Sequence, residues 1–282
     1  MSFVEKLKTN PVVYKIGVYL KIIYYDFIID TIDLMKIQMR KMNILKEHKF
    51  ELIKSYKDKF KGKRCFIIAT GPSLTMEDLA LLKDEYTIGV NSLVKVLDQM
   101  EYIPTFLGIQ DSLVYAKIGK LIDESKLKKI FITDKLYNSL DNKNSDRYIQ
   151  YSLYYKRHGE HNNLRPLTSG FSSDVSLCVY DGYSITYSML QIAVYMGFTE
   201  IYLLGCDCNY DTKGGKQHFV ESGHIDKNAA TGGERMIYAY TVADKELKER
   251  FPHVKVYNAT RGGMLEVFPR KTLDEIFKSS NI

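Results

Sequence analysis

The chain has 282 residues, 45% of them hydrophobic, and a formal net charge of +6. This length and apolar content predict a folded, soluble protein with one large domain or two small ones. The sequence shows no secretory signal with a small-residue cleavage site, and its cysteines are scattered in or beside apolar runs, at Cys65, Cys178, Cys206 and Cys208. We therefore expect a cytoplasmic protein with neither a disulfide framework nor a structural zinc ion.

Residues 1–62 form a block with a character of its own. Its first part is apolar and rich in tyrosine, but charges such as Lys15, Lys21 and Asp26 interrupt every run before it could span a membrane. Its second part is basic, because residues 36–64 carry eleven Lys or Arg against three acids. We expect a helical arm that packs on the main domain or on another subunit, which is the commoner fate of an apolar stripe. The alternative is an interfacial helix on an anionic membrane.

From Arg64 onward, short apolar runs alternate with helical segments. Strands are predicted at 65–69, 86–90, 105–109, 129–133, 200–205 and 254–259, and the clearest helices at 184–198 and 233–251. This alternation predicts a mostly parallel sheet with helices on both faces, so we expect residues 63–282 to form one α/β, Rossmann-like domain. The polar segment 134–182 has no clear period, and we interpret it as a lid or a binding insertion.

The stretch "ATGPSLTMED" follows the first predicted strand. Gly71 permits close approach of a ligand, Pro72 suits a first helical turn, and Ser73 or Thr75 is a candidate helix cap or phosphate contact. Ligands of open α/β sheets lie at the carboxyl ends of the strands, so this turn predicts a nucleotide phosphate site. The stretch lacks the Lys-Ser/Thr of a Walker A loop and the spaced glycines of the dinucleotide fingerprint. A tight turn without a ligand is the alternative.

Four motifs carry a resemblance to a known group: "FIIATGPSL", "GFTEIYLLGCD", the "HF" at 218–219 and "VYNATRGGMLEVFPR". Together they resemble a bacterial group related to the lipooligosaccharide sialyltransferases and the flagellin-modifying motility-associated-factor glycosyltransferases. The same group includes proteins resembling the archaeal 6-hydroxymethylpterin diphosphokinase. The resemblance covers about residues 64–275, leaves the arm outside, and implies a sialyltransferase-like variant of the GT-A fold.

Several site residues follow from this resemblance and from their positions after strands. The glycine turn and Asn91 would contact the nucleotide, and other polar residues would line the same edge of the sheet. The full set of candidate substrate-binding residues is Thr70, Gly71, Pro72, Ser73, Asn91, Gln110, Asp111, Ser112, Ser184, Thr186, Asp207, Tyr210, Asn258 and Thr260. Gly182 stands where the sialyltransferases have an arginine. This departure favours a nucleotide sugar other than that of sialic acid, which stays open as the donor.

Transfer of a sugar to an alcohol needs a base for the acceptor hydroxyl. Imidazole suits this task, and we expect His218 to be the base, with His224 as the substitute. Asp207 and Asp211 are separated by three residues rather than arranged as Asp-x-Asp, so we expect metal-independent transfer without a cofactor. Lys213, Lys216 or Arg261 would then screen the departing phosphate.

The sequence thus predicts an inverting glycosyltransferase that modifies a surface glycan, a lipooligosaccharide or a protein. Two alternatives stay open: an ATP- and Mg²⁺-dependent pyrophosphokinase of the pterin type that uses Asp111, Asp207 and Asp211, and a non-catalytic nucleotide-binding protein. The expected partners are the nucleotide sugar, its glycan or glycolipid acceptor, further copies of the chain, and an anionic membrane on its cytoplasmic side. Nucleic acid is not expected, because the basic block lacks interleaved stacking aromatics.

Overall fold

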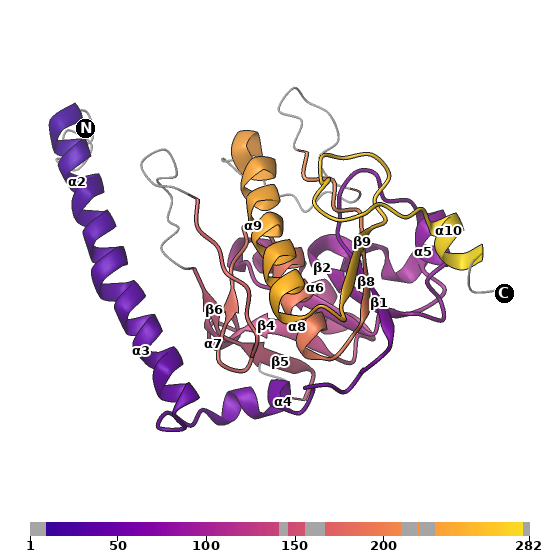
Figure 1. Ribbon diagram of the computed structural model, residues 1–282, viewed down its shortest axis with the longest axis horizontal. Coiled ribbons are helices and arrows are strands. Elements are labelled where there is room, and N and C mark those ends of the chain that lie inside the picture. The colour runs from indigo at the N-terminus through magenta and orange to yellow at the C-terminus, as the bar shows by residue number, and fades with distance from the viewer. Residues whose placement is uncertain (1–9, 141–145, 156–166, 210–218, 220–228, 279–282) are drawn as a thin grey trace.

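The computed structural model describes residues 10–140, 146–155, 167–209, 219 and 229–278. Figure 1 shows an α/β body and, beside it, a long helical arm that joins the body at one end. The arm corresponds to the N-terminal residues, and the first strand of the body starts at Arg64.

Within the described residues the body is built on a seven-stranded sheet of order β5-β4-β3-β2-β1-β8-β9, in which all neighbouring strands are parallel. A second, two-stranded sheet pairs β6 with β7. The strands are β1 (Arg64–Ile68), β2 (Tyr86–Val90), β3 (Phe106–Ile109), β4 (Ile130–Thr133), β5 (Tyr148–Tyr151), β6 (Leu153–Tyr154), β7 (Val179–Tyr180), β8 (Glu200–Leu204) and β9 (Lys255–Asn258). This confirms the predicted Rossmann-like α/β fold. The strand order reverses between β1 and β8, and open α/β sheets bind ligands at such a point.

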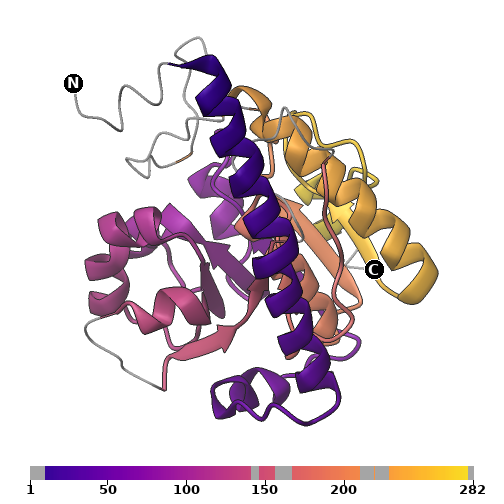
Figure 2. The ribbon, with the colours of Figure 1, turned by 90° about the vertical axis from the view of Figure 1, so that its left-hand side faces the viewer.

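The two faces of the sheet are covered by different helices. Along β1, Cys65 and Ile67 belong to the core cluster that includes α8 and α9, whereas Phe66 and Ile68 pack on the side of α5, η3 and α10. Figure 2 shows helices on both sides of the sheet. The helices are α5 (Met76–Ala80), η3 (Asn91–Gln99), α6 (Ser112–Glu124), α7 (Asp134–Asn138), α8 (Ile185–Tyr195), α9 (Ala229–Arg250) and α10 (Leu273–Lys278). Because both faces are covered, the strands are almost wholly apolar and buried.

The polar segment 134–182 is mainly part of the body. Residues 148–154 supply the edge strand β5 and the strand β6, and Phe171 and Val175 are buried in the main core. The side chain of Gln191 accepts hydrogen bonds from the Ser172 and Tyr180 backbone N–H groups, at 3.0 Å each, and so ties this segment to α8. The interpretation as a lid or insertion is therefore wrong for these residues, while 156–166 lie outside the described part.

The arm is one run of helix formed by α2 (Pro11–Ile23), the π-helical η1 (Tyr24–Ile29) and α3 (Asp30–Lys41). Two hydrogen bonds fasten it to the body: Tyr154 Oη donates to Asp30 Oδ1 at 2.5 Å, and Arg40 Nη1 donates to the Leu177 carbonyl at 2.9 Å.

The short helices η2 (His48–Phe50) and α4 (Glu51–Lys54) then lead toward β1, and Phe50 and Ile53 are buried in the main core. Among the helices of the described residues, none combines the length and the apolar character that crossing a membrane requires.

Candidate functional site

A cavity of about 90 Å³ opens at the carboxyl edge of the sheet, where β1, β2 and β8 end. Pockets that enclose a whole small ligand usually measure about 300–1,000 Å³. The cavity that the described residues form is therefore smaller than one that encloses a whole small ligand. Its lining includes many of the predicted site residues: Thr70, Gly71, Pro72, Asn91, Ser184, Thr186 and Asp207.

The glycine turn packs directly on the end of β8. The Gly71 N–H donates to the Gly205 carbonyl at 2.9 Å. A Cβ on Gly71 would lie 1.9 Å from Asp207 Oδ2 and 2.4 Å from the Gly205 carbonyl oxygen. The Ser73 hydroxyl donates to Asp207 Oδ2 at 2.8 Å. The turn needs glycine because of this close approach, and Ser73 holds the carboxylate in place.

The helix after the turn begins later than expected. Thr75 caps α5, since its hydroxyl accepts from the Asp78 N–H and the Asp78 carboxylate accepts from the Thr75 N–H. Pro72 lies four residues before the first helical residue, so its predicted place in a first helical turn is wrong.

The helix that does open onto the cavity is α8. Its N-cap is Ser184, whose hydroxyl accepts from the Thr186 N–H at 3.2 Å, and both residues line the cavity. The N-terminal end of a helix carries a partial positive charge, which attracts anions such as phosphate. The helix whose N-terminal end lines the cavity is thus α8 rather than α5.

Asn91 combines an unusual backbone with a buried acceptor. Its φ is 47°, in the left-handed region that costs a non-glycine residue about 1 kcal/mol or more. Its side-chain Oδ1 is buried and has no hydrogen-bond partner among the described residues. Tyr183 and Cys208, with φ of 64° and 49°, lie beside Ser184 and in the cavity lining respectively. Strain concentrated around a cavity indicates a functional site.

Asp207 is buried and lies in the lining of the cavity. Burial raises the pKa of its carboxyl group, and the hydrogen bond from Ser73 opposes this rise. The neighbouring thiols of Cys206 and Cys208 are also buried, which raises both pKa values, that of Cys208 to about 12. Asp207 and Asn91 offer oxygen acceptors, so this part of the cavity suits hydroxyl or amino donors of a ligand.

Three predicted site residues lie after β3 and outside the lining of the cavity. Gln110 Oε1 accepts from the Tyr151 hydroxyl at 3.2 Å and from the Ser188 hydroxyl at 2.9 Å. Asp111 is the N-cap of α6, which begins at Ser112. Gln110 thus belongs to an internal polar network, and Asp111 stabilises a helix end.

Two more predicted residues, Asn258 and Thr260, lie behind the cavity. Asn258 Nδ2 donates to the Leu265 carbonyl at 2.6 Å, and the Thr260 hydroxyl accepts from the Cys206 N–H at 2.9 Å. They hold the C-terminal loop against the end of β8, so they shape the site without lining it. Arg261, a candidate partner of the departing phosphate, forms an ion pair with Asp78.

The predicted residues His218, His224 and Tyr210 lie outside the described part of the chain, as do Asp211, Lys213 and Lys216. One residue of this stretch is described: the Phe219 N–H donates to the Thr70 carbonyl at 2.7 Å. The chain therefore passes the glycine turn at the residue that follows His218. Within the described ranges, no three His, Cys, Asp or Glu side chains form a group that could hold a metal ion.

Sequence reasoning did not single out some residues that line the cavity. Gly205 ends a predicted strand and Cys206 and Cys208 follow it, so the rule that ligands gather at carboxyl ends would have found them. Met236 and Tyr240 reach the cavity from α9, and the sequence carries no signal for this. The approach of α9 depends on Gly233, because a Cβ there would lie 2.1 Å from the Cys208 carbonyl oxygen.

The chain was compared with known proteins and protein families. One solved structure, "Structure of MAf glycosyltransferase from Magnetospirillum magneticum AMB-1", is 17% identical with a TM-score of 0.45, covering 83% of this chain and 40% of that chain. The chain thus spans less than half the length of that protein. No curated protein matches the chain. A family model described as "6-hydroxymethylpterin diphosphokinase MptE-like" matches residues 39–213, which is more than half of the chain and includes β1, β2, α8 and β8. The chain therefore belongs to this MptE-like family.

Proposed function

We propose that this chain is a glycosyltransferase that binds a nucleotide-sugar donor at the cavity between β1 and β8. The observation that carries the proposal is the buried Oδ1 of Asn91, which lies in the cavity lining and has no hydrogen-bond partner among the described residues. A buried acceptor without a donor costs about 1–3 kcal/mol, which a ligand hydroxyl or amino group would recover.

Different parts of the site suit different parts of a nucleotide. The positive end of α8 favours a phosphate, whereas Asn91 and Asp207 favour the donors of a ribose or a base. The motifs "FIIATGPSL" and "GFTEIYLLGCD", which resemble those of bacterial glycosyltransferases, supply the glycine turn and Asp207. The cavity and the motifs thus support the same ligand class.

In the proposed reaction, the acceptor hydroxyl gives its proton to His218, with His224 as the substitute base. The hydroxyl oxygen forms a bond to the anomeric carbon of the donor sugar, whose bond to the phosphate oxygen breaks. The nucleoside phosphate leaves with that electron pair, and the anomeric configuration inverts. The hydrogen bond between Phe219 and Thr70 supports this assignment, because it brings the chain next to His218 to the glycine turn.

A second candidate is a pyrophosphokinase, which the description of the family names. Such an enzyme transfers a diphosphoryl group from ATP and holds Mg²⁺ with carboxylates. One of its candidate ligands, Asp111, caps α6 and lies outside the cavity lining, whereas Asp207 lies in the lining. This separation favours the glycosyltransferase, and a third candidate, a nucleotide-binding protein without chemistry, would use the same cavity.

Thermal unfolding of the full chain with CMP-, UDP- and GDP-sugars and with ATP tests the proposal. We expect one nucleotide sugar to raise Tm equally with and without EDTA. At about 100 times its Kd a ligand adds about 2.7 kcal/mol, or roughly 5–10 °C. A response to ATP alone that EDTA abolishes would support the kinase instead. Binding without release of sugar or nucleotide would support the non-catalytic protein.

Substitution of Asn91 separates ligand binding from stability. We expect Asn91→Gly to weaken nucleotide binding about 5- to 100-fold through loss of the side-chain acceptor, with little change in Tm, because glycine tolerates a φ of 47°. Asn91→Ala should lose the same binding and also about 1 kcal/mol of stability, since alanine disfavours a positive φ more than asparagine does. Titration calorimetry and thermal unfolding of both variants measure the two effects. Unchanged affinity in Asn91→Gly would contradict the assignment.

A further inference from the structure

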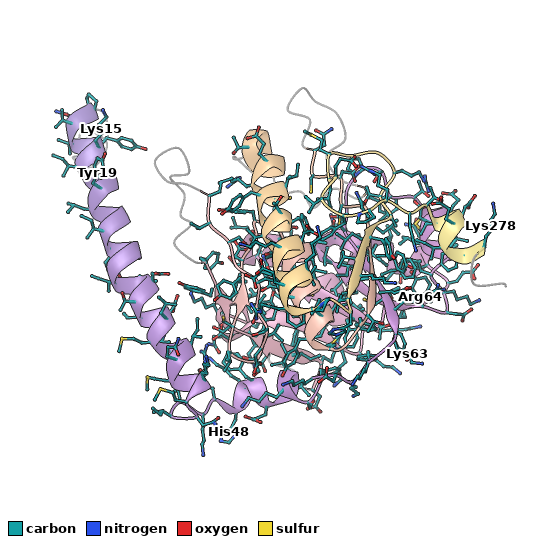
Figure 3. All side chains as sticks on the ribbon, in the orientation of Figure 1. Lys15, Tyr19, His48, Lys63, Arg64 and Lys278 are labelled. Carbon is teal, nitrogen blue, oxygen red and sulfur yellow. The ribbon has the colours of Figure 1, made fainter. Side chains whose placement is uncertain are left out.

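The arm exposes apolar side chains along its whole length. Lys15 and Tyr19 lie on the part of the arm that stands clear of the body (Figure 3). Toward its base, the exposed apolar residues recur every three or four positions, at Ile28, Ile32, Met35, Met39 and Met42. A spacing of this kind places side chains on one face of a helix. Further exposed apolar residues in α2 are Val12, Val13, Tyr14, Ile16, Leu20 and Ile23.

The charges of the arm are divided between its two faces. Asp30 is buried against Tyr154, and Asp33 is half-buried on the same helix face. Lys15, Lys36 and Lys41 are exposed. The acids described in the arm thus face the body, and the outward surface combines apolar and cationic groups.

A basic cavity lies at the base of the arm, beside the exposed Met42. It measures about 580 Å³, and its basic lining residues are Arg40, Lys41, Lys46, Lys54 and Lys57, against the acids Glu47 and Asp174. Arg40 is committed to Glu47 and to the Leu177 carbonyl, and Lys54 pairs with Glu51. Lys41, Lys46 and Lys57 are exposed and form no ion pair with another described residue.

The charge pattern decides between two occupants of this surface. Pairing with a second copy across the helix would bring the exposed lysines of both copies close together, and like charges repel. An anionic lipid surface would instead attract each lysine, by about 1 kcal/mol apiece, while the apolar side chains and tyrosines enter the boundary between headgroups and acyl chains.

We propose that the arm, with the basic cavity at its base, docks the protein on an anionic membrane surface. The exposed apolar side chains of residues 12–44 enter the interface, and Lys41, Lys46 and Lys57 contact phosphate headgroups. The docking does not rest on the proposed catalytic site, since the basic cavity and the cavity where β1 and β8 end share no lining residue. Its failure would leave the nucleotide site untouched.

Co-sedimentation of the full chain with vesicles tests the docking. We expect binding to vesicles of phosphatidylcholine with phosphatidylglycerol at low salt, weaker binding at high salt, and no binding to phosphatidylcholine alone. Ile32→Asp with Met35→Asp should abolish binding. Replacing Lys41, Lys46 and Lys57 by Gln should weaken it about 100-fold, at about 1 kcal/mol per lysine. The matched control is Leu113→Asp on α6. The Leu113 side chain is 58% exposed, and this variant should bind vesicles as the parent does.

Four outcomes would overturn the proposal: no binding of the parent chain, equal binding to both vesicle types, unchanged binding of the Ile32/Met35 variant, or equal weakening by Leu113→Asp. Light scattering in solution measures the oligomeric state as a second test. A parent dimer that Ile32→Asp turns into a monomer, together with absent vesicle binding, would assign the surface to a second copy instead. The substituted side chains are exposed, so unchanged Tm values confirm that every variant is folded.

Discussion

His218→Ala is expected to lower kcat for sugar transfer about 10²- to 10⁴-fold while nucleotide affinity stays within about twofold. A general base acts on the acceptor hydroxyl in the transition state, so its loss leaves donor binding intact. The Phe219 N–H donates to the Thr70 carbonyl at 2.7 Å, so the residue that follows His218 lies at the glycine turn. Steady-state kinetics with the donor found by thermal unfolding, together with calorimetry, measure both quantities.

Two other histidines make the test specific. His224→Ala should change kcat far less if His218 is the base, and the reverse ranking would move the role to His224. His253 lies on an exposed turn between α9 and β9, so His253→Ala is the control for loss of an imidazole as such. A His218→Ala enzyme with unchanged turnover, or one that no longer binds the donor, would contradict a role as base.

Gly71→Ala is expected to cost about 1–3 kcal/mol of stability, or roughly 3–10 °C in Tm, and to weaken nucleotide binding at least tenfold. The added methyl would lie 2.4 Å from the Gly205 carbonyl oxygen, and backbone cannot move aside as a flexible side chain can. It would also displace Asp207, whose carboxylate Ser73 holds beside the turn. Thermal unfolding and calorimetry measure the two losses.

Gly17→Ala is the matched control for this substitution. A Cβ on Gly17 meets nothing within 4 Å, and an exposed alanine in a helix is favoured over glycine by about 1 kcal/mol. This variant should therefore be as stable as the parent or slightly more so, with unchanged binding. If Gly71→Ala left Tm and nucleotide affinity unchanged, as Gly17→Ala should, then neither stability nor binding would depend on the close packing of the turn on β8.

The buried parallel strands were predictable because their apolar runs are nearly continuous. The strand at 86–90 agrees with its prediction at both ends, that at 200–204 ends one residue earlier than predicted, and that at 64–68 is shifted by one residue at both ends. The edge strand β5 was missed, since Tyr148–Tyr151 follows a polar segment and pairs with one neighbour only. The sequence predicts either Ser73 or Thr75 as the helix cap. The Thr-x-x-Asp pattern that starts at Thr75 indicates the later start of α5.

The candidate site was predictable to the extent that it depends on strand ends. The turn at Gly71 and Asn91 follow from the rule that carboxyl ends of parallel strands share an edge, whereas Ser184 and Thr186 at the start of α8 came from the resemblance to the sialyltransferases. The role of Gln110 was not predictable, because its partners Tyr151 and Ser188 are 41 and 78 residues away in sequence. Long-range side-chain bonds of this kind appear only once the fold brings the segments together.

The four buried cysteines have a consequence beyond the site. Burial raises the pKa of Cys178 and of Cys208 to about 12, and the pKa values of Cys65 and Cys206 rise as well. Oxidants and alkylating reagents attack the thiolate, which these pKa values suppress at neutral pH. Burial and these raised pKa values therefore slow the oxidation and alkylation of all four sulfur atoms. Because burial by itself can keep these thiols free, the free cysteines do not indicate the compartment in which this chain works.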